Sequence, residues 1–405
     1  MTGPALDPQI LDRLKGSRGP VLIALSGGGD SVALLHLLAD GLGRARLHAC
    51  VVDHALRAGS DADARFAYET AITRDVAAEI VALTWPDAAQ RNQETARRLR
   101  YVALCAAART IGARLIATAH TADDQTETLI LRAASGSGWR GLAGIGAWAP
   151  APVWPEGRGL AVVRPLLGVR REALREHLRA RGASWIEDPA NTNSAFARVR
   201  VRARLAELEA AGFEPMRIAA IASRLRALTN TVDRQAGELI ATAARFDADL
   251  IRLDRSRWRG GDEVRRRALA ALIAAAAGAE REPEAAALAR LEARLSDPGF
   301  RGASLGGAQL SGRGAIVELC RDPGALLGRA DGAQPLPDMS LPEAEEAVWD
   351  GRLAVQAYEP GFSVRAAPRS PEFLKCGEPA EPPPHHWILA ENVAHRLGAP
   401  RISAI

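Results

Sequence analysis

A run of small residues near the N-terminus, Ser-Gly-Gly-Gly-Asp-Ser at positions 26–31, has the composition of a phosphate-binding loop. Three consecutive glycines let the backbone turn tightly and approach a ligand. Ser26 and Ser31 add hydroxyl donors, and the N–H groups at the start of a following helix point at bound anions. Asp30 would repel a phosphate unless a divalent cation lay between them. The run therefore predicts a phosphate site in which Asp30 is a Mg²⁺ ligand.

A second group of reactive side chains begins at His120. Thr121 and Asp124 have the spacing of a capping box, which alone would account for one aspartate. Asp124 and Glu127 are three residues apart, so they share one helix face and form a pocket suited to a cation. That cation could be an amine, or a metal held by Asp123, Asp124 or Glu127, and the spacing does not choose.

Alternating strand and helix patterns must position these groups. Short apolar runs are predicted as strands at residues 21–25, 46–53, 80–84 and 114–120. Residues 62–80 and 92–111 have helical periodicity. This alternation predicts an α/β fold with a doubly wound parallel sheet. Asp53 and His54 close the second strand and His120 the fourth, so they are expected at the carboxyl edge of the sheet, where ligands of such folds bind.

The composition is that of a globular protein of two or three domains, with 405 residues of which 47% are hydrophobic and 25% charged. Its four cysteines form no C-x-x-C pair, which argues against a zinc ribbon or a disulfide framework. The longest apolar stretch, residues 268–279, is too short to cross a bilayer. No signal-peptide pattern precedes it, so a cytoplasmic protein without a membrane partner is expected.

Charge and composition change along the chain. Residues 164–226 hold 13 arginines, no lysine and 7 acidic residues, a net of +6 (13 − 7) against +4 for the whole chain. Such an excess predicts a surface that faces a polyanion. The predicted domains are residues 1–205, a mainly helical domain at 206–325, and a small C-terminal region of uncertain fold at 326–405. Short strands are predicted at 308–318 and 347–357, the second with an Asp350-Gly351 turn.

The motifs together resemble those of the PP-loop ATPases, and within them the tRNA(Ile)-lysidine synthetase family. The resemblance covers roughly residues 18–205. The matching motifs are the loop at 26–31, Val-Asp-His-x-Leu-Arg at 52–57, His-Thr-Ala-Asp-Asp-Gln-x-Glu-Thr at 120–128, Gly-Ser-Gly-x-x-Gly-Leu at 136–142, Arg-Pro-Leu-Leu at 164–167, and Asp188 with the arginine-rich segment. Ser135 and Val199 stand where the family usually has arginine and asparagine, which bears on the contacts of that loop and of Arg198.

The resemblance implies a PP-loop adenylation domain, followed by a helical domain and a small mixed C-terminal region. It also implies a ligase that adenylates the C2 oxygen of the wobble cytidine in an isoleucine tRNA with a CAU anticodon. Free lysine then attacks C2, and AMP and diphosphate are released. The implied ATP site comprises Ser26, Gly27, Gly28, Gly29, Asp30, Ser31, Asp53 and His54. The implied catalytic residues are Asp30, Arg100, His120, Asp124 and Glu127, of which Asp124 and Glu127 bind lysine and Asp30 binds Mg²⁺. The implied tRNA contacts are Arg164, Arg198, Arg200 and Arg202.

Two other functions compete with this one. A tRNA thiolase of the same superfamily would need paired cysteines or a persulfide cysteine near the site, and the signature loops contain none. A non-catalytic RNA-binding protein on the same fold would not need Asp30, His120, Asp124 and Glu127 together. The sequence predicts no oligomeric state.

Overall fold

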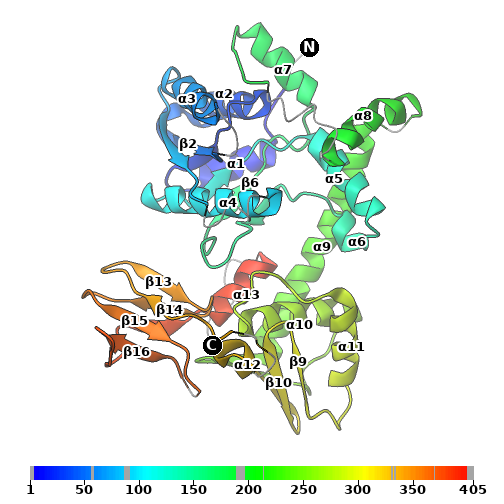
Figure 1. Ribbon diagram of the computed structural model, residues 1–405. Helices are drawn as coiled ribbons and strands as arrows, with labels where there is room; N and C mark the ends of the chain where they lie inside the picture. Colours follow the sequence, from blue (N-terminus) through cyan, green and yellow to red (C-terminus); the bar gives the residue numbers. More distant parts are fainter. Residues whose placement is uncertain are drawn as a thin grey trace. The chain divides into compact units, whose positions relative to one another are not determined.

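The computed structural model describes residues 4–55, 59–85, 92–187, 197–212, 214–329, 332, 334–368 and 370–398. Within these ranges, the side chains of residues 197–199, 203, 206, 208 and 215 are not described. The chain forms two compact units, Met1–Thr229 and Asn230–Ile405 (Figure 1). The finer division at residues 205 and 325 stays a prediction.

The first unit is built on a six-stranded sheet with the order β3-β2-β1-β4-β6-β5. Its strands are β1 (Val21–Ala24), β2 (Leu47–Asp53), β3 (Ala77–Ala82), β4 (Leu115–Ala117), β5 (Trp148–Pro150) and β6 (Ala161–Val163). All neighbours are parallel except β5, which runs antiparallel to β6. The predicted α/β fold with a parallel sheet is thereby confirmed.

Helices cover both faces of this sheet (Figure 1). One face packs against α1 (Pro8–Gly16), α2 (Gly29–Leu42), α3 (Ser60–Ile72) and α7 (Arg171–Ala180), and the other against α4 (Gln93–Thr110). Successive strand side chains alternate between the two cores, since Val21 and Ile23 lie in the first and Leu22 and Ala24 in the second. Because both faces of β1 are buried, its sequence is an unbroken run of apolar residues.

The remaining helices of the first unit are α5 (Ala122–Ala134), α6 (Trp139–Leu142) and α8 (Ala197–Ala210), while α9 (Pro215–Ala243) spans the boundary between units. One boundary differs from the prediction. The helix expected to reach residue 80 ends at Ile72, and β3 begins at Ala77. A turn separates them in which Asp75 has a φ of 55°, a backbone conformation that no helix can continue through.

The second unit combines helices with antiparallel sheets. A five-stranded sheet has the order β7-β8-β11-β10-β9. Its strands are β7 (Ala244–Asp247), β8 (Leu250–Asp254), β9 (Gly302–Leu305), β10 (Ala308–Arg313) and β11 (Ile316–Arg321). The helix α10 (Asp262–Ala276) is buried along most of its length and packs against α11 (Ala285–Leu295) and α13 (Leu389–Leu397). The residue pattern does not predict β7, β8 or β9.

Two smaller sheets complete this unit. Their strands are β12 (Met339–Ser340), β15 (Phe362–Arg365), β16 (Glu372–Lys375) and β17 (Glu378–Pro379) in one sheet, and β13 (Glu346–Trp349), β14 (Leu353–Gln356) and β18 (His385–Trp387) in the other. A short helix, α12 (Pro323–Leu327), precedes them. The predicted Asp350-Gly351 turn joins β13 to β14, and both residues have positive φ, 51° and 64°. Among the helices that the structure describes, none combines the length and the apolar character needed to cross a membrane.

Candidate active site

The loop between β1 and α2 has the geometry that its glycines predict. Gly27 has a φ of 80°, and a Cβ atom there would lie 2.6 Å from Ile186 Cδ1, so only glycine fits. Ile186 N–H donates to the Gly27 carbonyl at 2.9 Å, which braces the loop. Ser31 Oγ donates to the Gly28 carbonyl at 2.9 Å and accepts from Ser26 N–H at 3.2 Å. Ser31 therefore shapes the loop from inside, whereas Ser26 is exposed.

Three of the predicted acidic residues meet at one guanidinium, that of Arg171 at the start of α7. Arg171 Nε donates to Asp30 Oδ2 at 3.0 Å, and its two terminal nitrogens donate to Asp124 Oδ1 at 3.1 Å and to Glu127 Oε1 at 3.4 Å. The phosphate-type loop and the acidic pair on α5 thus form a single cluster. Sequence reasoning missed Arg171, because nothing in the pattern separates it from its arginine neighbours.

Glu127 lies at the buried end of this cluster. Its side chain has 0% exposure, and Arg202 of α8 contacts both of its oxygens, Nε to Oε1 at 2.5 Å and Nη2 to Oε2 at 3.3 Å. Two guanidiniums therefore cover one carboxylate. Arg202, predicted as a tRNA contact, faces the acidic cluster in this structure.

Asp124 serves two purposes. Its Oδ2 accepts from Thr121 N–H and Thr121 Oγ, both at 2.8 Å, and completes the capping box that the spacing predicts. Its Oδ1 faces Arg171. Burial alone would raise the pKa of Asp124, but Arg171 and the hydrogen bonds from Thr121 hold it below its ordinary value. The carboxylate is therefore ionised at neutral pH.

Asp123, one of the alternatives for a metal, has a structural partner. It accepts from the backbone N–H of Arg171 at 2.8 Å and from Arg170 Nε at 3.3 Å, and so caps the start of α7. No group of three or more His, Cys, Asp or Glu side chains in the described part of the chain could hold a metal. Asp30 is different in that no described residue donates to its Oδ1. That oxygen suits an ion which takes its other ligands from phosphates and water. Burial raises the pKa of Asp30 in spite of Arg171.

Basic and imidazole side chains lie near the acidic cluster, since Asp124 and Arg100 both affect the pKa of His120. No carboxylate of the described residues lies within ion-pair distance of Arg100, which projects from α4, and burial lowers the pKa of its guanidinium. Arg100 also contributes to lowering the pKa of His54 and of His120, after burial in both cases. A guanidinium without a carboxylate partner suits a phosphate group.

His120 follows β4 and hydrogen-bonds through Nδ1 to Thr118 Oγ at 3.0 Å. Burial, followed by the charge of Arg164, lowers the pKa of His120 to about 3, so the imidazole is neutral at physiological pH. Asp53 closes β2 by accepting from Ala55 N–H at 2.9 Å. His54 accepts at its carbonyl from Trp85 Nε1 at 2.8 Å. The polar residues that end β2 and β4 thus flank the loop after β1, as expected for parallel strands.

Comparison with known proteins agrees with this arrangement. Residues 8–209 match the model of a PP-loop domain family. A protein of Hyphomonas neptunium is 37% identical over 80% of this chain and 85% of its own, and one of Caulobacter vibrioides is 37% identical over 86% and 77%. A third, of Mesorhizobium japonicum, is 36% identical over 91% and 79%. All three are named tRNA(Ile)-lysidine synthase.

The chain belongs to the tRNA(Ile)-lysidine synthase family. It is therefore an ATP-dependent tRNA-modifying enzyme. Among solved structures, the U34-tRNA thiolase NcsA of Methanococcus maripaludis is a distant likeness, with a TM-score of 0.42 and 14% identity over 54% of this chain and 80% of that one.

The arginines predicted to contact tRNA have different surroundings in this lysidine synthase family member. Arg200 is exposed on α8. Arg164 is only 5% exposed and donates to the Gly146 carbonyl at 2.6 Å. A phosphate could not reach it without rearrangement, so we remove it from the predicted contacts. The side chain of Arg198 lies outside the described residues, as do Arg57 and Asp188.

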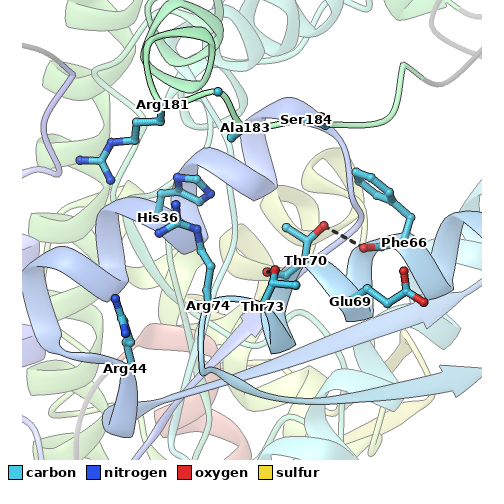
Figure 2. Close-up of a pocket in the computed structure, with 11 residues that line it drawn as sticks. His36, Arg44, Phe66, Glu69, Thr70, Thr73, Arg74, Arg181, Ala183 and Ser184 are labelled. Carbon is cyan, nitrogen blue, oxygen red and sulfur yellow. Dashed lines mark hydrogen bonds between the residues drawn. The ribbon is translucent and has the colours of Figure 1, made fainter.

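A cavity of about 560 Å³ elsewhere in the first unit contains none of the family's signature residues (Figure 2). The arginines that line it, Arg44, Arg74 and Arg181, follow the last turns of α2, α3 and α7. Helix C-termini carry partial negative charge, which these guanidiniums offset. An anion would compete against that charge, and we assign no ligand to the cavity.

Proposed function

We propose that this enzyme joins lysine to the wobble cytidine of an isoleucine tRNA with a CAU anticodon. ATP adenylates the C2 oxygen and diphosphate leaves. The lysine side-chain amine then attacks C2 and displaces AMP. A base carbonyl is a poor electrophile, so adenylation supplies the leaving group that substitution requires. The observation that supports the proposal is the meeting of Asp30, Asp124 and Glu127 around Arg171. The two carboxylates that would bind the amine therefore lie next to the loop that would bind the phosphates.

ATP would bind along the loop and the residues that flank it. Backbone N–H groups of residues 27–30, at the start of α2, would hold the departing diphosphate. Arg100, with no carboxylate partner among the described residues, would stabilise charge that develops on the α-phosphate. Asp30 would hold Mg²⁺ through Oδ1, and the bound ion would offset the negative charge of the phosphates.

Lysine would bind at the acidic pair. Asp124 and Glu127 would accept charge-assisted hydrogen bonds from its α-ammonium and so orient the side-chain amine towards C2. His120, with a pKa of about 3, is too weak a base to take the proton of the attacking amine efficiently. We assign it instead a neutral hydrogen-bonding role beside the nucleotide.

The phosphate backbone of the tRNA would lie along the exposed arginines of residues 164–226, Arg200 among them. Because its substrates are tRNA, ATP and free lysine, we place the reaction in the cytoplasm.

The test is diphosphate release in the presence of tRNA and each amino acid in turn. We expect turnover with isoleucine tRNA and lysine, with lysine recovered covalently on the tRNA. Binding of tRNA without diphosphate release would favour a non-catalytic RNA-binding protein. Turnover that requires a sulfur donor instead of lysine would favour a thiolase.

A further inference from the structure

Arg171 occupies the place that the proposed function assigns to a substrate ammonium. Its terminal nitrogens lie 3.1 Å from Asp124 Oδ1 and 3.4 Å from Glu127 Oε1. These are the two carboxylates that would bind lysine. The guanidinium and the substrate therefore need the same hydrogen-bond acceptors.

The burial of Glu127 makes this competition unavoidable. Its side chain has 0% exposure, whereas those of Asp124 and Asp30 are 11% and 26% exposed. An ammonium cannot touch a carboxylate that has no accessible surface. One of the two guanidiniums that cover Glu127 must move before lysine can bind there.

The contacts of Arg171 make it suited to that movement. Each of its three nitrogens donates to a different carboxylate, at 3.0 to 3.4 Å, and its contact with Glu127 is the longest. If its terminal nitrogens release Asp124 and Glu127, the bond from Nε to Asp30 can remain, so the side chain keeps a partner. Since Asp124, Asp30 and Glu127 outweigh burial and raise its pKa, Arg171 is charged throughout.

Charge supports the same exchange. The three carboxylates, Arg171 and Arg202 carry a formal charge of −1 together (−3 + 2). Without Arg171 the cluster would carry −2 at partly buried positions, which is costly unless a cation is present. The α-ammonium of a bound lysine can take over that compensation.

We propose that Arg171 is a resident counter-cation, which fills the ammonium site between Asp124 and Glu127 in the substrate-free enzyme and yields it to lysine. This inference rests on the proposed function and adds a residue that sets the affinity for the amine. Arg171 stabilises the empty cluster and lowers the affinity for lysine by competing with it.

The experiment compares Arg171→Met with Arg170→Met in the full-length enzyme. Arg170 lies at the same end of α7 and also forms ion pairs, but with Asp123 and Glu209, outside the cluster. For Arg171→Met we expect a lower melting temperature and a Michaelis constant for lysine that falls roughly tenfold, equivalent to about 1.4 kcal/mol. Methylguanidinium, which carries the group that this variant lacks, should raise its melting temperature and its Michaelis constant for lysine again, and should do so in no other variant. Arg170→Met should leave the constant for lysine unchanged.

A Michaelis constant for lysine that is unchanged or higher in Arg171→Met would overturn the inference. Failure of methylguanidinium to compete with lysine in this variant would overturn it as well. If the methionine variant does not fold, Arg171→Lys provides the test. A single ammonium cannot bridge three carboxylates, so we expect the Michaelis constant for lysine to fall in this variant too, but by less. A wild-type enzyme that forms lysidine while both variants keep the wild-type constant refutes only the role of Arg171. Absence of lysine-dependent turnover in the wild type would refute the proposed function itself.

Discussion

Replacement of Glu127 by glutamine separates a substrate-binding role from a structural one. The variant keeps the shape of the side chain but removes a charge that two guanidiniums contact, Arg202 at 2.5 Å and Arg171 at 3.4 Å. Because the side chain is fully buried, water cannot replace these interactions. Both stability and lysine binding are therefore expected to change.

The magnitudes follow from this burial. Breaking a buried ion pair costs about 3–5 kcal/mol, and since glutamine retains one acceptor we expect about 2–3 kcal/mol for Glu127→Gln. At roughly 2–4 °C per kcal/mol for a unit of this size, the melting temperature should fall by about 8 °C. A charge-assisted hydrogen bond to the α-ammonium contributes about 1.5–3 kcal/mol. Without it, the Michaelis constant for lysine should rise roughly 10- to 100-fold, with the constant for ATP within about twofold of wild type.

Glu292→Gln is the matched control. Glu292 is also buried, 7% exposed, and pairs with Arg265 at 2.5 Å, but it belongs to α11 in the second unit. The two variants should lose similar stability, and only Glu127→Gln should change the constant for lysine. Calorimetry and steady-state diphosphate release on the same preparations measure both effects. A destabilised Glu127→Gln enzyme with normal lysine kinetics would refute the amine pocket.

Three further outcomes are expected. Asp30→Asn should abolish diphosphate release while tRNA affinity stays nearly intact, because it removes the proposed Mg²⁺ ligand; near wild-type turnover at saturating Mg²⁺ would exclude that role. Affinity for tRNA should fall steeply as the salt concentration rises. Replacing the exposed Arg200 and Arg224 with glutamine should reduce the slope of log affinity against log salt by about one for each phosphate that the variant no longer neutralises. A flat plot, or an unchanged slope in the variant, would contradict a surface that faces a polyanion. Burial lowers the pKa of His36 from 6.5 to about 4. Between these two pH values the unfolded chain binds more protons than the folded one, so the folded state loses stability as the pH falls. The contribution of neutral His36 is therefore fully present above pH 6.5 and is lost towards pH 4, and it amounts to about 3 kcal/mol at most. His36→Leu should flatten this acid limb in urea titrations at about pH 5 and about pH 7.5, and an unchanged limb would show that other groups cause it.

The sequence by itself determined those features that depend on neighbours along the chain. The glycine loop, the strands that surround it and the Thr121–Asp124 capping box could be predicted because backbone conformation, side-chain periodicity and helix capping act over a few residues. The Asp350-Gly351 turn belongs to the same class. The start of β3 could not be placed, because residues 77–82 are largely exposed or half-buried and lack a clear alternation.

Only the tertiary structure decided which charged groups meet. Arg171 lies 141 residues from Asp30 and 44 from Glu127 in the chain, and Arg202 lies 75 from Glu127. Among thirteen arginines between residues 164 and 226, local pattern cannot tell the one that binds a carboxylate cluster from Arg164, which is buried against a carbonyl. Ion pairing is set by distance in space, and that distance follows from how α2, α5, α7 and α8 pack.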